Sequence, residues 1–248
     1  MFDKSIFLDN LDYMMKRNEI KARDIEEEAG VSKGYISRLK KEGNASIPGV
    51  DFVLTVASLV GVSAEIISTI RLSECSENEQ YYVNFLDRLI EKTGDKEIFW
   101  KKNTVRELKN KLENKKDEEV LFERPRSVGE SLIESFVGGY KYKSKFDYGE
   151  YSFEDTIGDF YSFKMDSRNV LYMVKVRVKK EEESFEGVEL FLLSNHEKVS
   201  NICSIIPGRP KKYDSLIYKL YNTVIEIINE GGLDEEAKAA INSFMKKQ

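Results

Sequence analysis

Apolar residues recur at helical spacing through roughly the first seventy positions of the chain. In the first segment they lie on one helix face, at Ile6, Phe7, Leu11, Met14 and Met15. Glycine and polar residues interrupt the pattern and separate four more short helices, which we expect at 22–29, 32–41, 50–60 and 63–70. Ser32 is expected to be the N-cap of the helix over 32–41. The pattern therefore predicts a five-helix, all-α unit over residues 1–72.

A longer helical segment follows this unit. Ser76 and Glu79 have the spacing of a capping box, in which each side chain bonds to the backbone N–H of the other residue. The same spacing recurs from Thr104, and the segment then enters a charged stretch at 113–119. We interpret residues 73–120 as a helical connector that ends in a charged linker.

After residue 120 the apolar residues alternate with polar ones, which is the period of a β-strand. On the clearest strand one face carries Val170, Tyr172, Val174, Val176 and Val178. Four strand-like segments are joined by short turns, and they span 157–165, 169–179, 187–194 and 198–206. Two amphipathic helices follow, one from Asp214 to Asn229 and one from Asp234. The pattern predicts an α+β domain over 121–248, with a small antiparallel sheet and two terminal helices.

The composition limits the function classes. The 248-residue chain has a formal net charge of −5 and a pI of about 5.3, which argues against a nonspecific nucleic-acid coat protein. No apolar run is long enough to cross a membrane, and the N-terminus lacks the pattern of a secretory signal. Two distant cysteines, Cys75 and Cys203, cannot form a zinc site of the usual kind with a single histidine. We therefore expect a cytoplasmic protein with reduced thiols and no metal or other cofactor.

The segment 21–43 has the sequence KARDIEEEAGVSKGYISRLKKEG, a pattern of two short helices joined by a turn. Gly30 provides a residue that adopts positive φ easily at the turn. Apolar residues are spaced to hold the second helix against the first, and they are Ile25, Ala29, Val31, Ile36 and Leu39. Polar side chains occupy the other side of the second helix. The segment therefore predicts a helix-turn-helix.

Three stretches together resemble a known family. They are the sequence AGVSKGYISRLKK, the proline-containing loop after it and the sequence LTVASLVGVSAEII. Their order and spacing resemble the lambda-repressor-like (Cro/C1-type, Xre) DNA-binding domain, and the resemblance covers roughly residues 5–70. It implies a five-helix fold that places its third helix in the major groove of double-stranded DNA.

The resemblance implies a role for each polar residue of the third helix. Lys33, Gly34 and Arg38 occupy positions that face base edges, and Ser32 lies where the helix starts. An arginine such as Arg38 reads guanine through two parallel hydrogen bonds, which discriminate by about 1–3 kcal/mol, whereas Gly34 has no side chain to read with. The positions suited to phosphate contact are those of Tyr35, Ser37, Lys41 and Asn44.

Three positions depart from the family's pattern. Ala22 stands where the family often has a phosphate-binding glutamine, and Glu26 stands where a small residue is usual. Lys40 replaces a common glutamate and adds positive charge to the third helix. Glu26, Glu27 and Glu28 make the second helix acidic, which weakens the expectation of phosphate contacts there.

Enzyme motifs fail along the chain, so we expect no catalytic or metal site. Self-cleaving repressors use a small-residue hinge, commonly Ala-Gly, and the chain has this pair only within the helix-turn-helix segment. The metallopeptidase motif His-Glu-x-x-His needs two histidines, and His196 is the single one. We interpret one acidic group as a solvated surface: Asp147, Glu150, Glu154, Asp155 and Asp159. We interpret one aromatic group as core: Phe146, Tyr148, Tyr151, Phe153, Phe160, Tyr161 and Phe163.

These observations predict a sequence-specific transcriptional regulator, in the simplest case a repressor that acts as a homodimer on a two-fold operator. The segment FLDRLIEKTGDKEIFWKK also resembles linker regions of phage-like regulators in low-GC Gram-positive bacteria. The C-terminal domain is then expected to dimerise or to sense an unidentified effector, either a protein or a small molecule. The alternative is a DNA-binding antitoxin, or a phage or mobile-element protein, whose C-terminal domain binds another protein.

Overall fold

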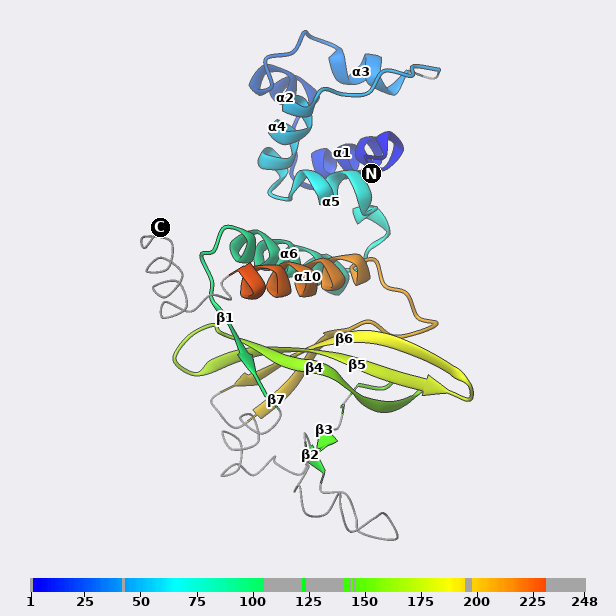
Figure 1. The fold of residues 1–248 in the computed structure, drawn as a ribbon. Helices are drawn as coiled ribbons and strands as arrows, with labels where there is room; N and C mark the ends of the chain where they lie inside the picture. The colour runs from blue at the N-terminus through cyan, green and yellow to red at the C-terminus, as the bar shows by residue number, and fades with distance from the viewer. Residues whose placement is uncertain are drawn as a thin grey trace, which may run out of the picture. The chain divides into compact units, whose positions relative to one another are not determined.

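A computed structural model divides the chain into two compact units (Figure 1). It describes residues 2–41, 43–104, 122–123, 141–142, 144, 146–194 and 198–230. The first unit comprises Met1–Leu89 with Lys211–Leu216, and the second comprises Ile90–Pro210 with Ile217–Gln248. We call them the helical unit and the sheet unit. Within the described residues, no helix combines the length and the apolar composition needed to cross a membrane.

The helical unit is all-α, as the sequence predicted. Its helices are α1 (Lys4–Arg17), α2 (Ala22–Glu28), α3 (Tyr35–Lys40), α4 (Val50–Val60) and α5 (Ala64–Thr69), followed by the 3-10 turn η1 (Leu72–Glu74). The next helix, α6 (Glu77–Gly94), belongs to the helical unit as far as Leu89, and its last residues belong to the sheet unit. The first five helices share one core, whose fully buried members include Phe7, Leu11, Ile25, Ile36, Val56, Ile66 and Ile67. Burial of each such side chain contributes about 1.5–3 kcal/mol, so the core fixes α2 and α3 in place.

The capping box predicted before α6 is confirmed. The N–H of Ser76 donates to Oε2 of Glu79 at 2.9 Å, and the N–H of Glu79 donates to the hydroxyl of Ser76 at 3.3 Å. Two N–H groups at the start of α6 are thereby satisfied by reciprocal side-chain bonds.

Asn10 ties α1 to the end of α5. Its side chain is fully buried, and its amide nitrogen donates to the carbonyls of Ile67 at 2.9 Å and Ile70 at 2.6 Å. Its side-chain oxygen accepts the N–H of Leu72 at 2.8 Å. Helix ends leave carbonyls without partners inside the helix, and buried ones must be satisfied elsewhere. One amide therefore closes the helical unit where α5 ends.

The sheet unit contains a five-stranded antiparallel sheet in the order β1-β4-β5-β6-β7. Its strands are β1 (Trp100–Asn103), β4 (Ser152–Lys164), β5 (Asn169–Lys180), β6 (Glu183–Ser194) and β7 (Lys198–Ser204). The four strands predicted after residue 120 are confirmed, and they pair in chain order. A separate two-stranded pairing joins β2 (Phe122–Glu123) to β3 (Lys141–Tyr142).

The strand β1 was not predicted. It lies within the segment that we interpreted as a helical connector, and it pairs with β4 from Trp100 opposite Phe163 to Asn103 opposite Phe160. Four residues place only two side chains on each face, which is too short a pattern to distinguish a strand by its period. The pairing with β4 therefore determines its conformation.

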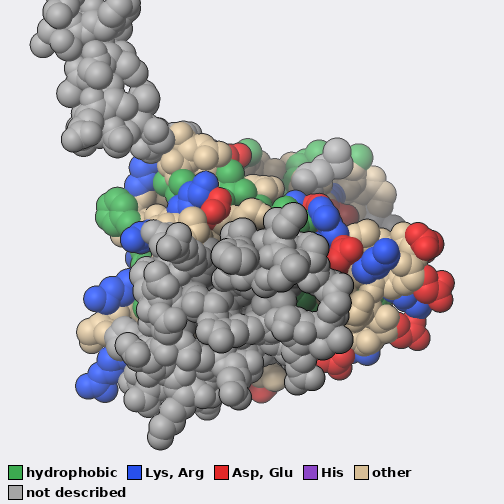
Figure 2. All heavy atoms as spheres, turned by 60° about the horizontal axis from the view of Figure 1, so that its bottom comes forward, with side chains coloured by type: hydrophobic (Ala, Val, Ile, Leu, Met, Phe, Trp, Pro, Cys, Tyr) green, Lys and Arg blue, Asp and Glu red, His purple; other side chains and the backbone are tan. Residues whose placement is uncertain are grey.

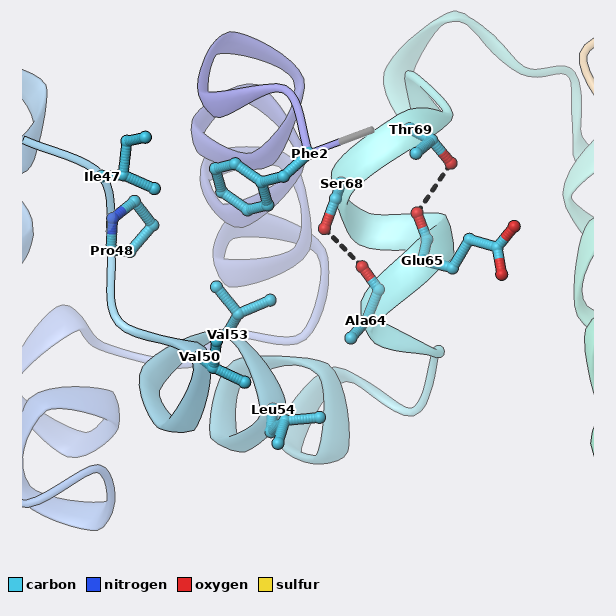
Figure 3. Close-up of a pocket in the computed structure, with 10 residues that line it drawn as sticks. All are labelled: Phe2, Ile47, Pro48, Val50, Val53, Leu54, Ala64, Glu65, Ser68 and Thr69. Atoms are coloured by element: carbon cyan, nitrogen blue, oxygen red, sulfur yellow. Dashed lines mark hydrogen bonds between the residues drawn. The ribbon is translucent and has the colours of Figure 1, made fainter. Parts of the chain in front are cut away.

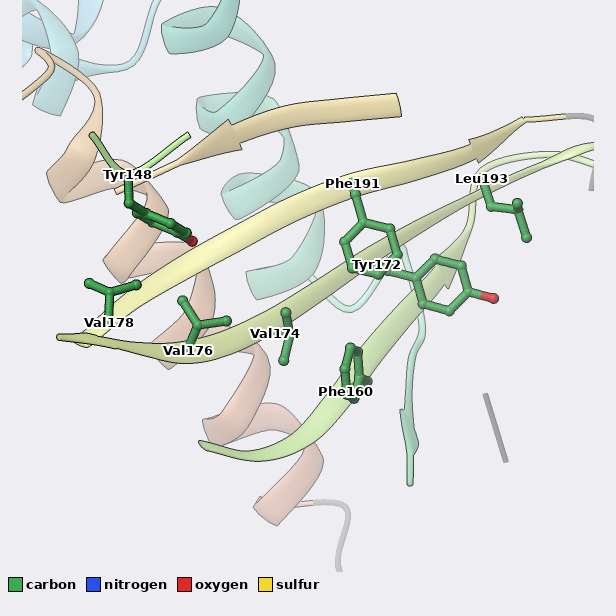
Figure 4. Packing of buried hydrophobic residues seen from close by; sticks show 8 residues of the cluster. All are labelled: Tyr148, Phe160, Tyr172, Val174, Val176, Val178, Phe191 and Leu193. Atoms are coloured by element: carbon green, nitrogen blue, oxygen red, sulfur yellow. The ribbon is translucent and has the colours of Figure 1, made fainter. Parts of the chain in front are cut away.

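The two faces of the sheet pack against different parts of the sheet unit. α10 (Asp214–Glu230) lies along one face (Figure 1), where Tyr221 packs edge-on against Tyr161 with 5.9 Å between ring centroids. Side chains alternate along a strand, so neighbouring residues project from the opposite face. That face carries the buried cluster of Tyr148, Phe160, Tyr172, Val174, Val176, Val178, Phe191 and Leu193 (Figure 4). The shared face predicted for β5 is therefore confirmed, and Tyr148 and Phe160 are core residues as expected.

Some predictions fall outside the described residues. They concern the helix after Thr104 with its linker at 113–119, the second terminal helix from Asp234, and His196. Cys75 and Cys203 are both described, and each is a buried thiol without a disulfide.

Replacing Asn10 by alanine should destabilise the helical unit by about 3 kcal/mol, because two carbonyls and one N–H would be buried without partners. Hydrogen–deuterium exchange of peptides that cover α1 and α5 measures the loss as faster exchange. The matched control is Asn84→Ala at an exposed position of α6, which should change stability by less than about 0.5 kcal/mol. Equal exchange in the two variants would show that Asn10 does not hold this end of α5.

Candidate nucleic-acid interface

The α2–α3 segment begins with a helix that ends in a Schellman motif. Gly30 has a φ of 63°, the left-handed conformation that the sequence predicted at this turn. The N–H of Val31 donates to the carbonyl of Glu26 at 3.0 Å, and the N–H of Gly30 donates to the carbonyl of Glu27 at 3.1 Å. These two bonds satisfy carbonyls at the end of α2 and turn the chain toward α3.

The side chain of Glu26 reaches from α2 to the start of α3. Its Oε2 accepts the N–H of Gly34 at 2.8 Å, and its Oε1 accepts the N–H of Ile36 at 2.9 Å. Only 5% of Glu26 is exposed, so water competes little for these bonds. The first N–H groups of a helix lack partners within the helix, and a carboxylate also matches the positive end of the helix dipole. Glu26 therefore caps α3 from the neighbouring helix.

α3 starts later than predicted. We expected a helix over 32–41 with Ser32 at its N-cap, but α3 spans Tyr35–Lys40 and Gly34 occupies the N-cap. The reason is the backbone of Gly34, whose φ of 78° lies outside the right-handed helical region. Ser32 is exposed and precedes the helix, and Glu26 provides the cap that we expected from Ser32.

Arg38 folds back over the turn between α2 and α3. Its Nη1 donates to the carbonyl of Lys33 at 3.0 Å, and its Nη2 donates to the hydroxyl of Ser32. A Cβ added to Gly34 would lie 3.5 Å from Nη1, so the guanidinium passes beside this glycine. A guanidinium has five N–H groups, and three remain for another molecule while these two bonds are made. The structure thus brings together the residues predicted to face base edges.

Positive charge is exposed on and beside α3. From Gly30 to Lys41 the chain has no acidic residue, and its basic residues are Lys33, Arg38, Lys40 and Lys41. All of them are exposed, as is Ser37, and Lys40 forms an ion pair with Asp12 of α1. Lysine and arginine on a surface are the groups that attract a phosphate backbone.

Tyr35 and Asn44 are half-buried and make contacts within the helical unit. The ring of Tyr35 packs edge-on against Phe52 with 4.9 Å between centroids. The amide nitrogen of Asn44 donates to the carbonyl of Arg38 at 2.6 Å, and its side-chain oxygen accepts the N–H of Ser46 at 2.8 Å. Asn44 therefore closes the C-terminal end of α3, and these bonds use only one of the two N–H groups of its amide.

An apolar pocket of about 400 Å³ lies elsewhere in the helical unit, between the loop before α4, α4 itself and α5 (Figure 3). Three of its side chains are strongly exposed: Ile47 at 70%, Val50 at 73% and Leu54 at 52%. Two hydroxyls in its lining bond within α5, where Thr69 donates to the carbonyl of Glu65 at 2.7 Å and Ser68 to that of Ala64. The pocket therefore offers mainly apolar contact.

A buried polar cluster lies in the sheet unit around Glu189 of β6, which is fully buried. Its Oε1 accepts hydrogen bonds from the hydroxyls of Tyr148 and Ser144, and the Tyr148 hydroxyl lies 3.4 Å from that of Ser204. Burial raises the pKa of Tyr148, and the negative charge of Glu189 raises that pKa further. Tyr148 therefore stays protonated at neutral pH and donates to Glu189, which anchors the chain before β4 to β6.

Charges of both signs are interspersed along the right-hand edge of Figure 2. Within the sheet unit, Lys175 and Arg177 of β5 pair with Glu186 of β6, and Lys180 pairs with Glu150. Four acids that we predicted to be solvated are exposed: Asp147, Glu150, Glu154 and Asp155. In the part of the chain that the structure describes, no three His, Cys, Asp or Glu side chains gather as a metal site would require.

Sequence reasoning missed the role of Glu26, which we treated as a departure that weakens the interface. The signal lay in its position on α2. Residue 26 follows Ala22 by four positions and precedes Ala29 by three, so it shares their helix face. A carboxylate on a face that packs inward needs hydrogen-bond donors, and here the start of α3 supplies them.

Comparisons with protein-family profiles, with curated proteins and with solved structures found no match. The α2–α3 segment itself is therefore the basis for a functional proposal. This segment combines an exposed basic helix, a turn closed by backbone hydrogen bonds and a buried carboxylate that caps the helix start.

Replacing Gly34 by alanine should destabilise the helical unit by about 1–2 kcal/mol, because an L-residue is disfavoured in the left-handed region. Space is not the obstacle, since the added Cβ would make only an ordinary contact at 3.5 Å. Gly49→Ala is the matched control, because Gly49 is also an N-cap but has a φ of −63° and no atom within 4 Å of an added Cβ. Exchange rates of amides in α2 and α3 measure both variants, and equal rates would contradict the left-handed turn.

Proposed function

We propose that this protein is a sequence-specific DNA-binding transcriptional regulator with a lambda-repressor-like domain in its helical unit. The observation that carries the proposal is the acid-free, basic stretch from Gly30 to Lys41, exposed on a short helix that a core and a cap hold in place. The motif resemblance over roughly residues 5–70 supports the same function. Its partner is double-stranded DNA, which a bacterial regulator of this kind meets in the cytoplasm.

In this proposal α3 enters the major groove. The groove is about 12 Å wide and admits one helix with its side chains. Arg38 and Lys33 contact base edges, and Gly34 lets the backbone approach the DNA closely. Phosphates are held by Ser37 and Lys41, by the hydroxyl of Tyr35 and by the remaining amide N–H of Asn44. Ser32 lies near both the base edges and the phosphates.

The active form is a homodimer on a two-fold operator. A reading helix of six residues contacts few bases. In a dimer, binding of one protomer to its half-site makes binding of the second protomer intramolecular, which raises the total affinity. Half-sites about 34 Å apart, which is one turn of DNA, fit this arrangement. The sheet unit then supplies the dimer contact or an effector site. Occupation of a promoter by the dimer represses transcription without any catalytic step.

Selection from a pool of random duplexes should enrich one two-fold symmetric sequence. On that duplex Arg38→Ala should lose about 1–3 kcal/mol of binding free energy, because a base contact is removed. Lys41→Ala should weaken binding to enriched and random duplexes alike and lower the salt slope by about 1, because a phosphate contact is removed. Fluorescence anisotropy at several salt concentrations measures both effects.

Two results would contradict the proposal. One is a selection that enriches no sequence, with equal affinity of the intact protein for every duplex. The other is a specific complex in which Arg38→Ala and Lys41→Ala both bind as tightly as the original chain. Enrichment of a single half-site by a monomer would retain DNA reading and reject the homodimer.

A further inference from the structure

We propose that Glu26 is the positioning residue that gives α3 its sequence specificity. The inference rests on the proposed function and deepens it, because it identifies what fixes the reading geometry of Arg38. Glu26 contacts no DNA in this account. It acts through the backbone at the turn between α2 and α3 and at the start of α3, from which its two carboxylate oxygens each accept one hydrogen bond.

The cap of α3 needs two acceptors at once. Oε2 and Oε1 of Glu26 each accept one N–H, at 2.8 Å from Gly34 and 2.9 Å from Ile36. A charged acceptor makes a hydrogen bond roughly twice as strong as a neutral one. Glutamine has the same shape but only one acceptor oxygen, so its NH₂ group would face an N–H donor. Glu26→Gln therefore removes one bond and weakens the other without leaving a cavity.

The cap of α3 is linked to Arg38 through the turn between α2 and α3. Glu26 holds the N–H of Gly34 at the left-handed turn, and the carbonyl of Gly34 accepts the N–H of Arg38 at 3.0 Å. The residues just before this turn, Ser32 and Lys33, supply the hydroxyl and the carbonyl that receive the guanidinium of Arg38. A change in the turn therefore moves both the helix that carries Arg38 and the groups that hold its side chain.

A guanidinium that is held in place before binding differs from a mobile one. A mobile arginine can reorient toward whichever acceptor a base offers, and its side chain loses conformational entropy when it binds. Arg38 is already oriented by two bonds, so its remaining N–H groups point in set directions before DNA arrives. An arginine that cannot reorient to suit a wrong base discriminates more strongly between the right base and the wrong ones. Loss of the cap should therefore lower specificity more than it lowers total DNA affinity.

The chain offers matched controls for a simple charge effect. Glu27 and Glu28 lie next to Glu26 on α2 and carry the same charge, but both are exposed. Removal of any one of these charges reduces repulsion of phosphate by a similar amount. Only removal of Glu26 alters the cap of α3.

The experiment compares the full-length chain with its Glu26→Gln and Glu27→Gln variants. The probes are the duplex that the original chain enriches and a random duplex of equal length, and the readout is the ratio of the two affinities. Glu26→Gln should lower this ratio about tenfold, whereas Glu27→Gln should leave it unchanged. A purely stabilising role would reduce the folded fraction and weaken both affinities equally, so the ratio would not move. The amide signals of Gly34 and Ile36 in ¹H–¹⁵N spectra should shift in Glu26→Gln alone.

A second test covers the case in which Glu26→Gln fails to fold. Ser32→Ala removes only the exposed hydroxyl that holds Arg38, and Ser58→Ala on α4 is its exposed control. Ser32→Ala should lower the affinity ratio in the original chain but cause no further loss in an Arg38→Ala background. Additive losses would show that Ser32 contacts DNA by itself, which would overturn the link to Arg38.

The outcomes separate this inference from the proposed function. Specific binding that survives Glu26→Gln with the ratio unchanged overturns the inference and leaves the proposed function intact. Equal loss of the ratio in Glu26→Gln and Glu27→Gln also overturns the inference, because the charge of α2 would then be the cause. If the original chain shows no sequence preference, the proposed function is overturned, and the inference with it.

Discussion

The two hydrogen bonds that the carboxylate of Glu26 accepts from the backbone N–H groups of Gly34 and Ile36 are the interaction on which the proposed reading surface depends. α3 has six residues, and an isolated helix of that length is not stable in water. It persists because Ile36 and Leu39 are buried on one side and because a carboxylate satisfies two N–H groups at its start. The same bonds fix the turn from which Lys33 and Arg38 take their positions. The positions of exposed side chains on and beside α3 thus depend on one buried side chain, that of Glu26.

The distribution of charge follows from this constraint. The chain is acidic as a whole, with a net charge of −5, and α2 is the most acidic part of the α2–α3 segment. A carboxylate at the start of α3 is favourable because it faces the positive end of a helix dipole. Glu26 therefore places negative charge at the start of α3, the proposed DNA-reading helix, where backbone N–H groups bond to it. Exposed acids further away are screened over about 10 Å at ordinary salt, so the local arrangement rather than the total charge decides where a phosphate binds.

Much of the architecture could be predicted from residue patterns. The helices of the helical unit and the four long strands followed from apolar periods of 3.6 and 2, and the side chains exposed on α3 followed from the same helical period. Two features required tertiary information. β1 has too few residues to show a period, and its conformation depends on β4. The start of α3 was misplaced because local preference favours Ser32 as the N-cap, whereas a carboxylate from another helix decides the outcome. The intrachain contacts of Tyr35 and Asn44 likewise depend on Phe52 and on the loop after α3.

The most direct test of the central claim is to map the DNA contact by NMR. Deuterated, ¹⁵N-labelled full-length protein is titrated with the duplex that it selects, and amide shifts are followed in both units. The proposed interface at α3 requires that the largest shifts and the strongest line broadening fall within residues 32–41, with smaller changes along the rest of the helical unit. Large shifts confined to the strands of the sheet unit, with residues 32–41 unchanged, would contradict it.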